Sequence, residues 1–353
     1  MSPYPSASTA NDPQAPASAG MLLAVDLDGT LVNTDTLFEA LAERLGRRPF
    51  WTLSQMIQLP FAIARVKARI QSAGRIDIPT LPVNEQVLAY CHQSKQAGRP
   101  VWLVSAADQL IVTQVAEHFG VFDRAVGSDG AINNKGSAKG VFLQKVAPEG
   151  FEYVGDSRAD LKVWVKAKAA SLVGGDEARV RAVERMGATI ANRFDRPKRG
   201  VGAWLKALRP LRWVKNVLIF VPALATMQIA DPSILFALLL ALPALCATAS
   251  GVYILNDLVD LRDDRAHPAR NTRPFASGRL KIWQGFVVGP ALMLGGLLGG
   301  LFLSPPFALA MFAYVAISLA YSFSLKRVAW AKTATRLLLI ALRLVMGAAL
   351  LYR

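Results

Sequence analysis

The sequence predicts two unlike domains, an α/β domain on a parallel sheet followed by an all-α domain of membrane-spanning helices. The 353 residues are 53% apolar and only 18% charged, which is too apolar for one ordinary soluble domain. Short apolar runs that end in acids and glycines mark the first 200 residues, as expected of parallel strands carrying a site at their carboxyl ends. Long apolar runs fill the remainder, as expected of helices that cross a bilayer.

Charge is unevenly divided between these two parts. Of 40 basic and 25 acidic residues, 201–353 holds sixteen basic and only five acidic ones. The segments 196–215, 262–281 and 326–336 are basic, whereas 227–233 and 304–306 have no Lys or Arg, so we expect the basic segments to face the cytoplasm. This pattern favours an integral protein of a bacterial-type inner membrane, with the first domain cytoplasmic, over nucleic-acid binding.

The domain boundaries follow from composition. Residues 1–20 are mostly Pro, Ser and Ala and lack the basic and apolar regions of a secretory signal, so we expect a disordered leader. The α/β domain is predicted over 21–194, a polar linker over 195–207, and the membrane domain over 208–353. The two cysteines fall in different domains and offer no disulfide framework.

The α/β domain contains four short motifs, which follow one another along the chain. The first is DLDGT, with Asp26 and Asp28, directly after the apolar run 21–25. An apolar run at 101–104 then ends at Ser105, Lys139 follows, and a run at 151–154 leads into GDSRAD. Acids and glycines at strand ends can be turn chemistry alone. The four ordered motifs together, however, resemble the haloacid dehalogenase (HAD) superfamily, whose Rossmann-like parallel sheet with a helical cap we therefore expect.

The resemblance implies a phosphatase with a carboxylate nucleophile. Asp26 would attack phosphorus and form an aspartyl-phosphate. Asp28, two residues on, would protonate the leaving oxygen and then activate water. Ser105 would hold the oxygens of the transferring phosphoryl group.

A lysine and two further acids complete this expected site. Lys139 would neutralise phosphoryl charge; Lys135 is an alternative, but Lys139 opens the helix after the turn, as the family motif does. Asp156 would share Mg²⁺ with Asp26 and with Asp28, the latter through its carbonyl. Asp160 would support that metal shell.

The roughly seventy residues between the first two motifs have helical patterning, most clearly over 50–70. We interpret them as a helical cap that shapes the pocket. Because the segment 50–70 is amphipathic and basic at its end, contact with the membrane surface is the alternative.

A second acidic motif follows the apolar run 234–255, in the stretch NDLVDLRDDRAHPARNTRPFASG. On a continuing helix Asp257, Asp260 and Asp264 would share one face, while Asp263 would point away. Carboxylates so placed repel one another unless a cation lies between them, and oxygen ligands suit Mg²⁺. Helix capping beside topological arginines is the alternative, but it does not require three acids on one face.

This stretch resembles the UbiA family of intramembrane prenyltransferases, through NDxxDxxxD and the RPxxxG that follows. The preceding LRPLRWVKN resembles the branch typified by decaprenyl-phosphate phosphoribosyltransferase. The resemblance implies a Mg²⁺-diphosphate site at the cytoplasmic face, in which the metal is held by Asn256, Asp257, Asp260 and Asp264. Phosphate contacts are expected from Lys215, Asn216, Arg270, Arg273 and Arg343; for Arg343, snorkelling or a structural pair is the alternative.

The reaction that the resemblance implies joins a phosphorylated donor to a lipid. Polyprenyl phosphate would attack phosphoribosyl diphosphate, and the phosphatase would then remove the 5-phosphate from the product. Prenylation of an aromatic quinone or haem precursor is an alternative, and a non-catalytic membrane anchor for the phosphatase is another.

Five membrane spans are predicted, over 213–227, 234–255, 283–303, 307–323 and 337–352. Glycines at 295, 296, 299 and 300 indicate close helix packing within the third. A complete UbiA-type domain has nine helices and a second aspartate motif, so we expect this one to be incomplete. Whether the chain is a fragment, or is completed by another polypeptide, stays open, and with it the transferase activity of the chain alone.

Overall fold

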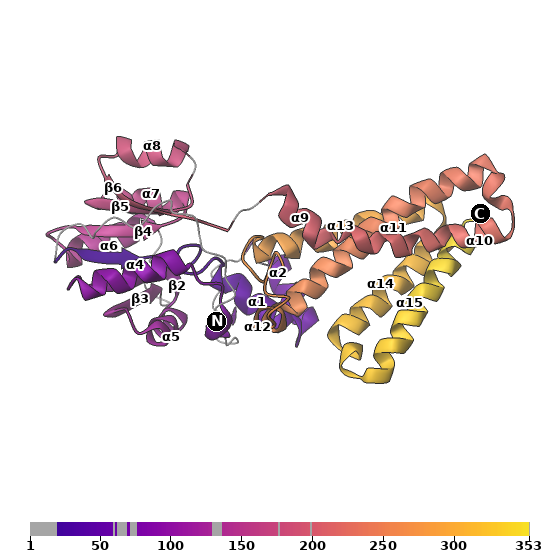
Figure 1. The fold of residues 1–353 in the computed structure, drawn as a ribbon, viewed down its shortest axis with the longest axis horizontal. Coiled ribbons are helices and arrows are strands. Elements are labelled where there is room, and N and C mark those ends of the chain that lie inside the picture. The colour runs from indigo at the N-terminus through magenta and orange to yellow at the C-terminus, as the bar shows by residue number, and fades with distance from the viewer. Residues whose placement is uncertain are drawn as a thin grey trace. The chain divides into compact units, whose positions relative to one another are not determined.

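The computed structural model describes residues 20–58, 61, 69–70, 76–128, 136–175, 177–197 and 200–352 (Figure 1). The chain forms two compact units, Met1–Leu37 with Ile76–Pro197 and Phe38–Arg75 with Lys198–Arg353. We call the first the sheet unit and the second the helical unit. The predicted leader up to residue 19, and Lys135, lie outside the described residues.

The sheet unit is built on six parallel strands in the order β3-β2-β1-β4-β5-β6. Their bounds are β1 Leu22–Val25, β2 Val101–Asp108, β3 Arg124–Ser128, β4 Phe151–Gly155, β5 Ala169–Val173 and β6 Thr189–Phe194. Strand β1 lies between β2 and β4, so the winding of the chain reverses there. Ligands of such sheets bind outside the carboxyl ends of the strands at this reversal. The expected parallel α/β fold is confirmed.

Helices cover both faces of this sheet because its strands are buried on both. Leu23 and Val25 of β1 belong to one apolar cluster, and Leu22 and Ala24 to another. The first cluster is closed by α4 (Glu85–Gln96) and α5 (Gln109–Phe119). The second is closed by α6 Ser137–Val146, α7 Leu161–Trp164 and α8 Glu177–Arg185. Two short 3₁₀ turns, Ile78–Thr80 and Arg158–Asp160, complete the described elements of the unit.

The helical unit contains no strand among its described residues. Its α-helices are α1 Thr36–Leu45 (from Phe38 on), α2 Pro49–Gln58, α9 Val201–Leu208, α10 Val221–Ala225, α11 Pro232–Val259, α12 Leu261–Ala266, α13 Ile282–Leu303, α14 Pro305–Phe323 and α15 Ala329–Ala349. Three 3₁₀ helices lie between them, η3 Pro210–Phe220, η4 Gln228–Ala230 and η5 Leu325–Arg327. Helix α9 thus covers most of the stretch expected to be a linker.

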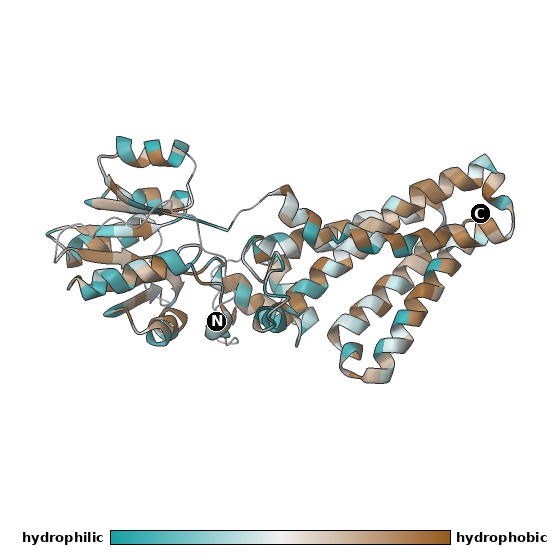
Figure 2. Cartoon of the chain, viewed as in Figure 1, coloured by the Kyte–Doolittle hydropathy of each residue, from teal (hydrophilic) through white to brown (hydrophobic). Residues whose placement is uncertain are grey.

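Three helices of the described chain, α11, α13 and α14, are long and apolar enough to cross a membrane, where the sequence predicted five spans. Brown, apolar stretches run along these helices in Figure 2. The first predicted span is instead divided between η3 and α10, with Pro222 in the first turn of α10, where its missing N–H is tolerated. The last becomes α15, whose Lys332, Arg336 and Arg343 lower its apolarity.

The sequence predicted one continuous helix through the acidic motif, but helix α11 does not continue through it. It ends at Val259, and Asp260 leaves helical geometry with φ −91° and ψ 7° before α12 begins. Asp260 bonds the Asn256 amide and pairs with Lys326, a partner from a distant segment that the spacing along one helix cannot reveal. Asp263 is exposed, as expected.

The expected close packing of glycines is found at part of the predicted stripe. A Cβ on Gly296 of α13 would lie 2.1 Å from Thr248 Oγ1 and 2.4 Å from the Ala244 carbonyl of α11. A Cβ on Gly295 would meet nothing within 4 Å. The backbones of α11 and α13 therefore approach closely along the face that carries Gly296.

The segment expected to form the cap contributes to the helical unit. Helix α2, and α1 from Phe38 on, fall within Phe38–Arg75, a segment of the helical unit. Ala42 and Leu45 of α1 are buried in an apolar cluster with residues of α9, α11 and α12. Parts of the predicted amphipathic stretch, 59–60 and 62–68, lie outside the described residues.

Candidate functional sites

The first site lies where the chain reverses in the sheet. Asp26 directly follows β1, Ser105 lies in β2, and Asp156 directly follows β4. Parallel strands present their carboxyl ends at one edge, so these three motifs meet although up to 130 residues separate them. Ser105 is buried, and its hydroxyl accepts the backbone N–H of Ala107 at 3.1 Å.

Asp26 lies beside a buried lysine. Lys139 Nζ donates to Asp26 Oδ1 at 2.8 Å and to the Tyr153 hydroxyl at 2.8 Å. Burial raises the pKa of Asp26 to about 6; the Lys139 charge opposes that rise, and the Asp160 and Asp156 charges add to it. At neutral pH the carboxylate is mostly ionised and can act as a nucleophile.

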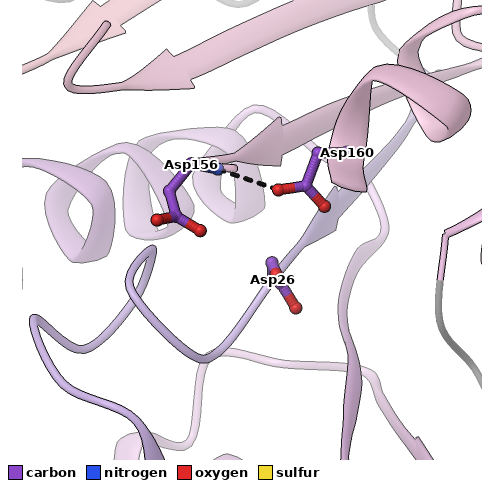
Figure 3. A group of neighbouring side chains, drawn as sticks. All are labelled: Asp26, Asp156 and Asp160. Carbon is purple, nitrogen blue, oxygen red and sulfur yellow. Dashed lines mark hydrogen bonds between the residues drawn. The ribbon is translucent and has the colours of Figure 1, made fainter. Parts of the chain in front are cut away.

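Asp160 is held by four donors. Its Oδ2 accepts the backbone N–H groups of Asp156 at 3.1 Å and Ser157 at 2.8 Å, and the Ser157 hydroxyl at 2.7 Å. Its Oδ1 accepts the Tyr153 hydroxyl at 2.9 Å. Figure 3 shows Asp160 facing Asp156 and Asp26, and one carboxylate oxygen of each lies within 4.8 Å of the others. Since its lone pairs are largely engaged, Asp160 is suited to supporting the other two acids.

Asp28 is bound at the start of α1. Its carboxylate accepts the Thr36 backbone N–H at 2.9 Å and the Thr36 hydroxyl at 3.3 Å. Burial, and next the Asp35 charge, raise the pKa of Asp28 well above its usual value. A carboxyl that keeps its proton is the form required of a general acid.

Arg196 is a site residue that the sequence reasoning missed. It follows β6, and its guanidinium donates to Asp156 Oδ2 and, at 2.9 Å, to the Gly29 carbonyl. Gly29 has φ +77°, and a Cβ there would lie 2.6 Å from Asp156 Oδ2. The glycine of DLDGT thus permits the approach of Asp156, and no motif near Arg196 signals its role.

The donor set fits a divalent cation. Asp26, Asp156 and Asp160 supply three carboxylates, whereas Lys139 and Arg196 supply two positive charges at the same place. Carboxylate oxygens with a surplus of negative charge are what Mg²⁺ prefers. Of the residues expected to hold the metal, Asp26, Asp156 and Asp160 are therefore brought together.

The second site is the acidic motif of the helical unit. Asp257 is buried and pairs with Arg209 and, at 3.3 Å, with Arg273. Asp264 is also buried; Arg273 donates to its Oδ2 at 2.6 Å, and Arg270 lies 3.2 Å from its Oδ1.

The third acid of the motif is paired with a cation from a different segment of the chain. Asp260 pairs with Lys326 and accepts from the Asn256 amide at 3.0 Å. Lys326 and Arg209 were not expected at this site. Arg209 ends α9 in the left-handed region with φ 56°, a conformation rare for arginine and enriched at functional sites.

Charge and unsatisfied oxygens indicate what this second cluster would bind. In the part of the chain that the structure describes, Asp257 Oδ2 is buried without a hydrogen-bond partner, and Asp264 Oδ1 has only the ion pair with Arg270 and no hydrogen bond. Three carboxylates face four cations, Arg209, Arg270, Arg273 and Lys326. The surplus is positive, so a metal ion arriving together with an anionic diphosphate fits better than a metal alone.

The remaining expected phosphate contacts lie elsewhere in the helical unit. Arg343 Nε donates to Asn216 Oδ1 at 3.0 Å and NH2 to the Tyr314 hydroxyl at 3.2 Å, and a third donor bonds the Leu339 carbonyl. Arg343 and Asn216 are both buried, and within the described residues their hydrogen bonds include no acid. Lys215 is exposed. The structure thus pairs Asn216 with Arg343, apart from the contacts of the aspartate cluster.

Two family descriptions match the chain. Residues 23–164 match the haloacid dehalogenase-like hydrolases, and residues 219–352 match the UbiA prenyltransferase family. The first match includes Asp26, Asp156 and Asp160, and the second includes Asp257, Asp260 and Asp264. The chain therefore joins a HAD-like hydrolase domain to a UbiA-family domain, as the motifs predicted.

Three relatives match different shares of the chain. An uncharacterized protein y4nM of Sinorhizobium fredii is 37% identical over 92% of this chain and 63% of its own length. Decaprenyl-phosphate phosphoribosyltransferase of Mycobacterium tuberculosis is 37% identical over 37% of this chain and 44% of its own length. Nodulation protein NoeC of Azorhizobium caulinodans is 41% identical over 26% of this chain and 30% of its own length. The chain thus spans less than two thirds of each of these relatives.

Two solved structures are similar to about half of the chain. A substrate-bound phosphoserine phosphatase is 18% identical, with a TM-score of 0.36, over 50% of this chain and 94% of that chain. A phospho-aspartyl intermediate analogue of phosphoserine phosphatase is 20% identical, with a TM-score of 0.35, over 54% of this chain and 99% of that chain.

Proposed function

We propose that the sheet unit is a Mg²⁺-dependent phosphatase that works through an aspartyl-phosphate. The observation that carries the proposal is the position of Asp26, at the end of the central strand and 2.8 Å from the buried Lys139 ammonium, with Asp156 and Asp160 beside it. A nucleophile, a charge-neutralising cation and a metal-binding acid pair thus converge on one edge of the sheet.

In this mechanism an Asp26 oxygen attacks the phosphorus of a phosphate ester, and the bond from phosphorus to the leaving oxygen breaks. Asp28, whose raised pKa favours the protonated acid, gives its proton to the leaving oxygen. Asp28 then takes a proton from the water that hydrolyses the aspartyl-phosphate. Inorganic phosphate and the free carboxylate of Asp26 result.

Other residues bind and orient the phosphoryl group. Lys139 and Ser105 would contact its oxygens, and Lys139 would offset the charge that develops on them. Asp26, the Asp28 carbonyl and Asp156 would hold Mg²⁺, which supplies further charge neutralisation when bound. Asp160 would keep Asp156 in place through the backbone N–H bond between them.

For the helical unit we propose a transferase site for a diphosphate donor and a polyprenyl phosphate acceptor. Support comes from the cation-rich cluster around Asp257, Asp260 and Asp264, and from the decaprenyl-phosphate phosphoribosyltransferase relatives. Asn256 and the three acids would hold Mg²⁺-diphosphate, with Arg270 and Arg273 on phosphate oxygens. Lys215, Asn216 and Arg343 remain proposed contacts for a phosphate group.

The two reactions would follow one another in one compartment. Transfer of a phosphoribosyl group onto the lipid gives a product that still carries a phosphate ester, the class of substrate that the sheet unit would hydrolyse. The basic segments 196–215, 262–281 and 326–336 support a cytoplasmic position for both sites.

The phosphatase proposal is tested on the whole chain in detergent with a panel of phosphate esters. Asp26→Asn should abolish Mg²⁺-dependent release of phosphate, whereas Asp123→Asn, which alters a surface ion pair with Lys95, should leave it within about twofold of wild type. Absence of Mg²⁺-dependent turnover by folded wild-type protein would reject the proposal.

The transferase proposal is tested by release of diphosphate from phosphoribosyl diphosphate in the presence of polyprenyl phosphate. A parallel assay supplies a prenyl diphosphate with an aromatic acceptor instead. Turnover in the first assay that Asp257→Ala abolishes supports the proposal, and turnover in the second favours aromatic prenylation. If neither assay shows turnover, and wild type binds Mg²⁺-diphosphate no better than Asp257→Ala, the helical unit is an anchor.

A further inference from the structure

Helix α1 has an unusual place in the chain. Its sequence lies between the first and second phosphatase motifs, yet from Phe38 on it belongs to the helical unit. Ala42 and Leu45 are buried with Leu258 and Leu261, at the end of α11 and the start of α12 that carry the aspartate motif. A segment interrupting the hydrolase sequence is therefore part of the core beneath the proposed transferase site.

A buried ion pair joins α1 to the aspartate motif. Arg265, the residue after Asp264, donates to both carboxylate oxygens of Glu39, at 2.9 Å and 2.6 Å. The two side chains are only 6% and 5% exposed. Two parallel bonds between a guanidinium and a carboxylate fix geometry as well as charge.

Arg265 also holds the loop that carries the phosphate-binding arginines. Its Nε donates to the Ala276 carbonyl at 3.1 Å. In the same loop the Ser277 backbone N–H and hydroxyl both bond the Arg273 carbonyl, at 2.9 Å and 2.8 Å. The Arg273 side chain in turn reaches Asp257 and Asp264. A continuous set of bonds thus runs from Glu39 to the acidic cluster.

We propose that Glu39 is a positioning residue for the diphosphate site of the helical unit, acting through Arg265. The inference rests on the proposed transferase site and extends it, because it places part of that site's support within the hydrolase sequence. Glu39 neutralises the Arg265 charge, so that Arg265 does not compete with ligand for the neighbouring Asp264. It also fixes Arg265 where it bonds Ala276, which keeps Arg273 directed at Asp257 and Asp264.

The experiment compares Glu39→Gln with Glu43→Gln in the whole chain. Glu43 lies one turn further along α1 and pairs with the exposed Arg47 at 3.1 Å, so the same substitution there is a matched control. Hydrogen exchange of the Ser277, Gly278 and Leu280 amides should be at least about tenfold faster in Glu39→Gln and unchanged in Glu43→Gln. Equal exchange in both variants would overturn the proposal.

A binding measurement distinguishes positioning from general loosening of the fold. In an Asp26→Asn background, which prevents hydrolysis, we expect Glu39→Gln to weaken binding of Mg²⁺-pyrophosphate at the helical site about tenfold, while Glu39→Asp keeps most of it. Adding Glu39→Gln to Arg265→Met should have little further effect. In the wild-type background, Glu39→Gln should leave phosphate-ester hydrolysis within about twofold. Wild-type binding affinity in Glu39→Gln, or loss of phosphatase activity, would contradict the proposal.

Failure of the proposed transferase site would look different. In that case the Asp26→Asn protein itself would show no pyrophosphate binding that Asp257→Ala removes. The exchange comparison would still decide whether Glu39 positions the loop, because it requires no ligand.

Discussion

The two acidic sites of this chain are organised in opposite ways. In the sheet unit, Asp26 and Asp156 come from two strands far apart in the sequence, and Asp160 is held by backbone N–H groups and hydroxyls. In the helical unit, the three acids come from one stretch of eight residues and are held mainly by Arg and Lys side chains. In the first site neutral hydrogen bonds hold Asp160, although Asp26 and Asp156 are ion-paired with Lys139 and Arg196. In the second site all three acids are held by ion pairs.

The difference indicates what each site would bind. A surplus of negative charge, with one acid locked by backbone donors, favours a resident metal ion and a substrate phosphate that arrives afterwards. A surplus of cations around partly unsatisfied carboxylates favours a ligand that brings both metal and diphosphate. Neutral hydrogen bonds hold a site in shape before ligand arrives, whereas ion pairs can be replaced by phosphate oxygens.

The largest expected effect concerns the lysine of the sheet site. Lys139→Met should lower kcat/KM for phosphate esters about 10²- to 10³-fold, because a buried charge directed at the phosphoryl oxygens is lost. Lys145→Met, on the exposed end of the same helix, is the matched control and should stay near wild type. The measurement is steady-state kinetics of both variants. Equal kcat/KM values for Lys139→Met and Lys145→Met would refute the role of Lys139.

The aspartates of the helical site should differ among themselves. Asp257→Ala should weaken binding of Mg²⁺-pyrophosphate about 10- to 100-fold, since Asp257 is buried beside Arg209 and Arg273. Asp263→Ala, at an exposed position of the same motif, should bind as wild type. Calorimetric titration in an Asp26→Asn background measures both. A loss of affinity in Asp263→Ala would show that the motif acts through general charge and not through one cluster.

The frame that carries the helical site depends on close helix packing. Gly296→Leu should destabilise the helical unit by about 1–3 kcal/mol or more, because a side chain would overlap Thr248 and the Ala244 carbonyl. Gly295→Leu faces open space and should be tolerated. Hydrogen exchange of α11 and α13 amides gives the comparison, and equal stability of the two variants would contradict the observed approach of these helices.

The smallest expected effect is a pH dependence of the metal-free sheet unit. The folded pKa of Asp26 is raised from 3.8 to about 6, so the folded state holds this proton more tightly than the unfolded state does. Stability should therefore fall as pH rises from about 4 to about 6. Asp26→Asn lacks this contribution.

The pH effect is measured as the difference between wild type and Asp26→Asn at each pH, by exchange of the β1 and β4 amides without metal. As pH is lowered from 7 to 5, the stability of wild type should increase relative to that of the variant. Addition of Mg²⁺ at pH 7, which favours the ionised carboxylate, should stabilise wild type more than the variant. A difference that does not vary with pH would contradict the raised pKa.

Prediction from the sequence succeeded where the site residues belong to short motifs of consecutive residues. DLDGT and GDSRAD follow short apolar runs, and parallel pairing then brings Asp26 and Asp156 to one edge, so both the fold and the meeting of these acids were predictable. The prediction of one continuous helix through Asp260 was wrong, since α11 ends at Val259 and Asp260 lies outside helical geometry before α12 begins. Of the five predicted membrane spans, three in the described chain are long and apolar enough to cross a membrane, and α15 carries charges that lower its apolarity.

By itself, the sequence determined which residues are chemically able to act, namely the acids of DLDGT and GDSRAD, Lys139 between them, and the acids that follow the apolar run 234–255. It also determined the positions of the long apolar helices. Only the tertiary structure decided which cations face those acids. Arg196 reaches Asp156, Arg209 reaches Asp257, and Glu39 holds Arg265 across more than two hundred residues. A single arginine or glutamate carries no periodic signal, and its partner is set by packing between distant segments, so these contacts could not be predicted from spacing.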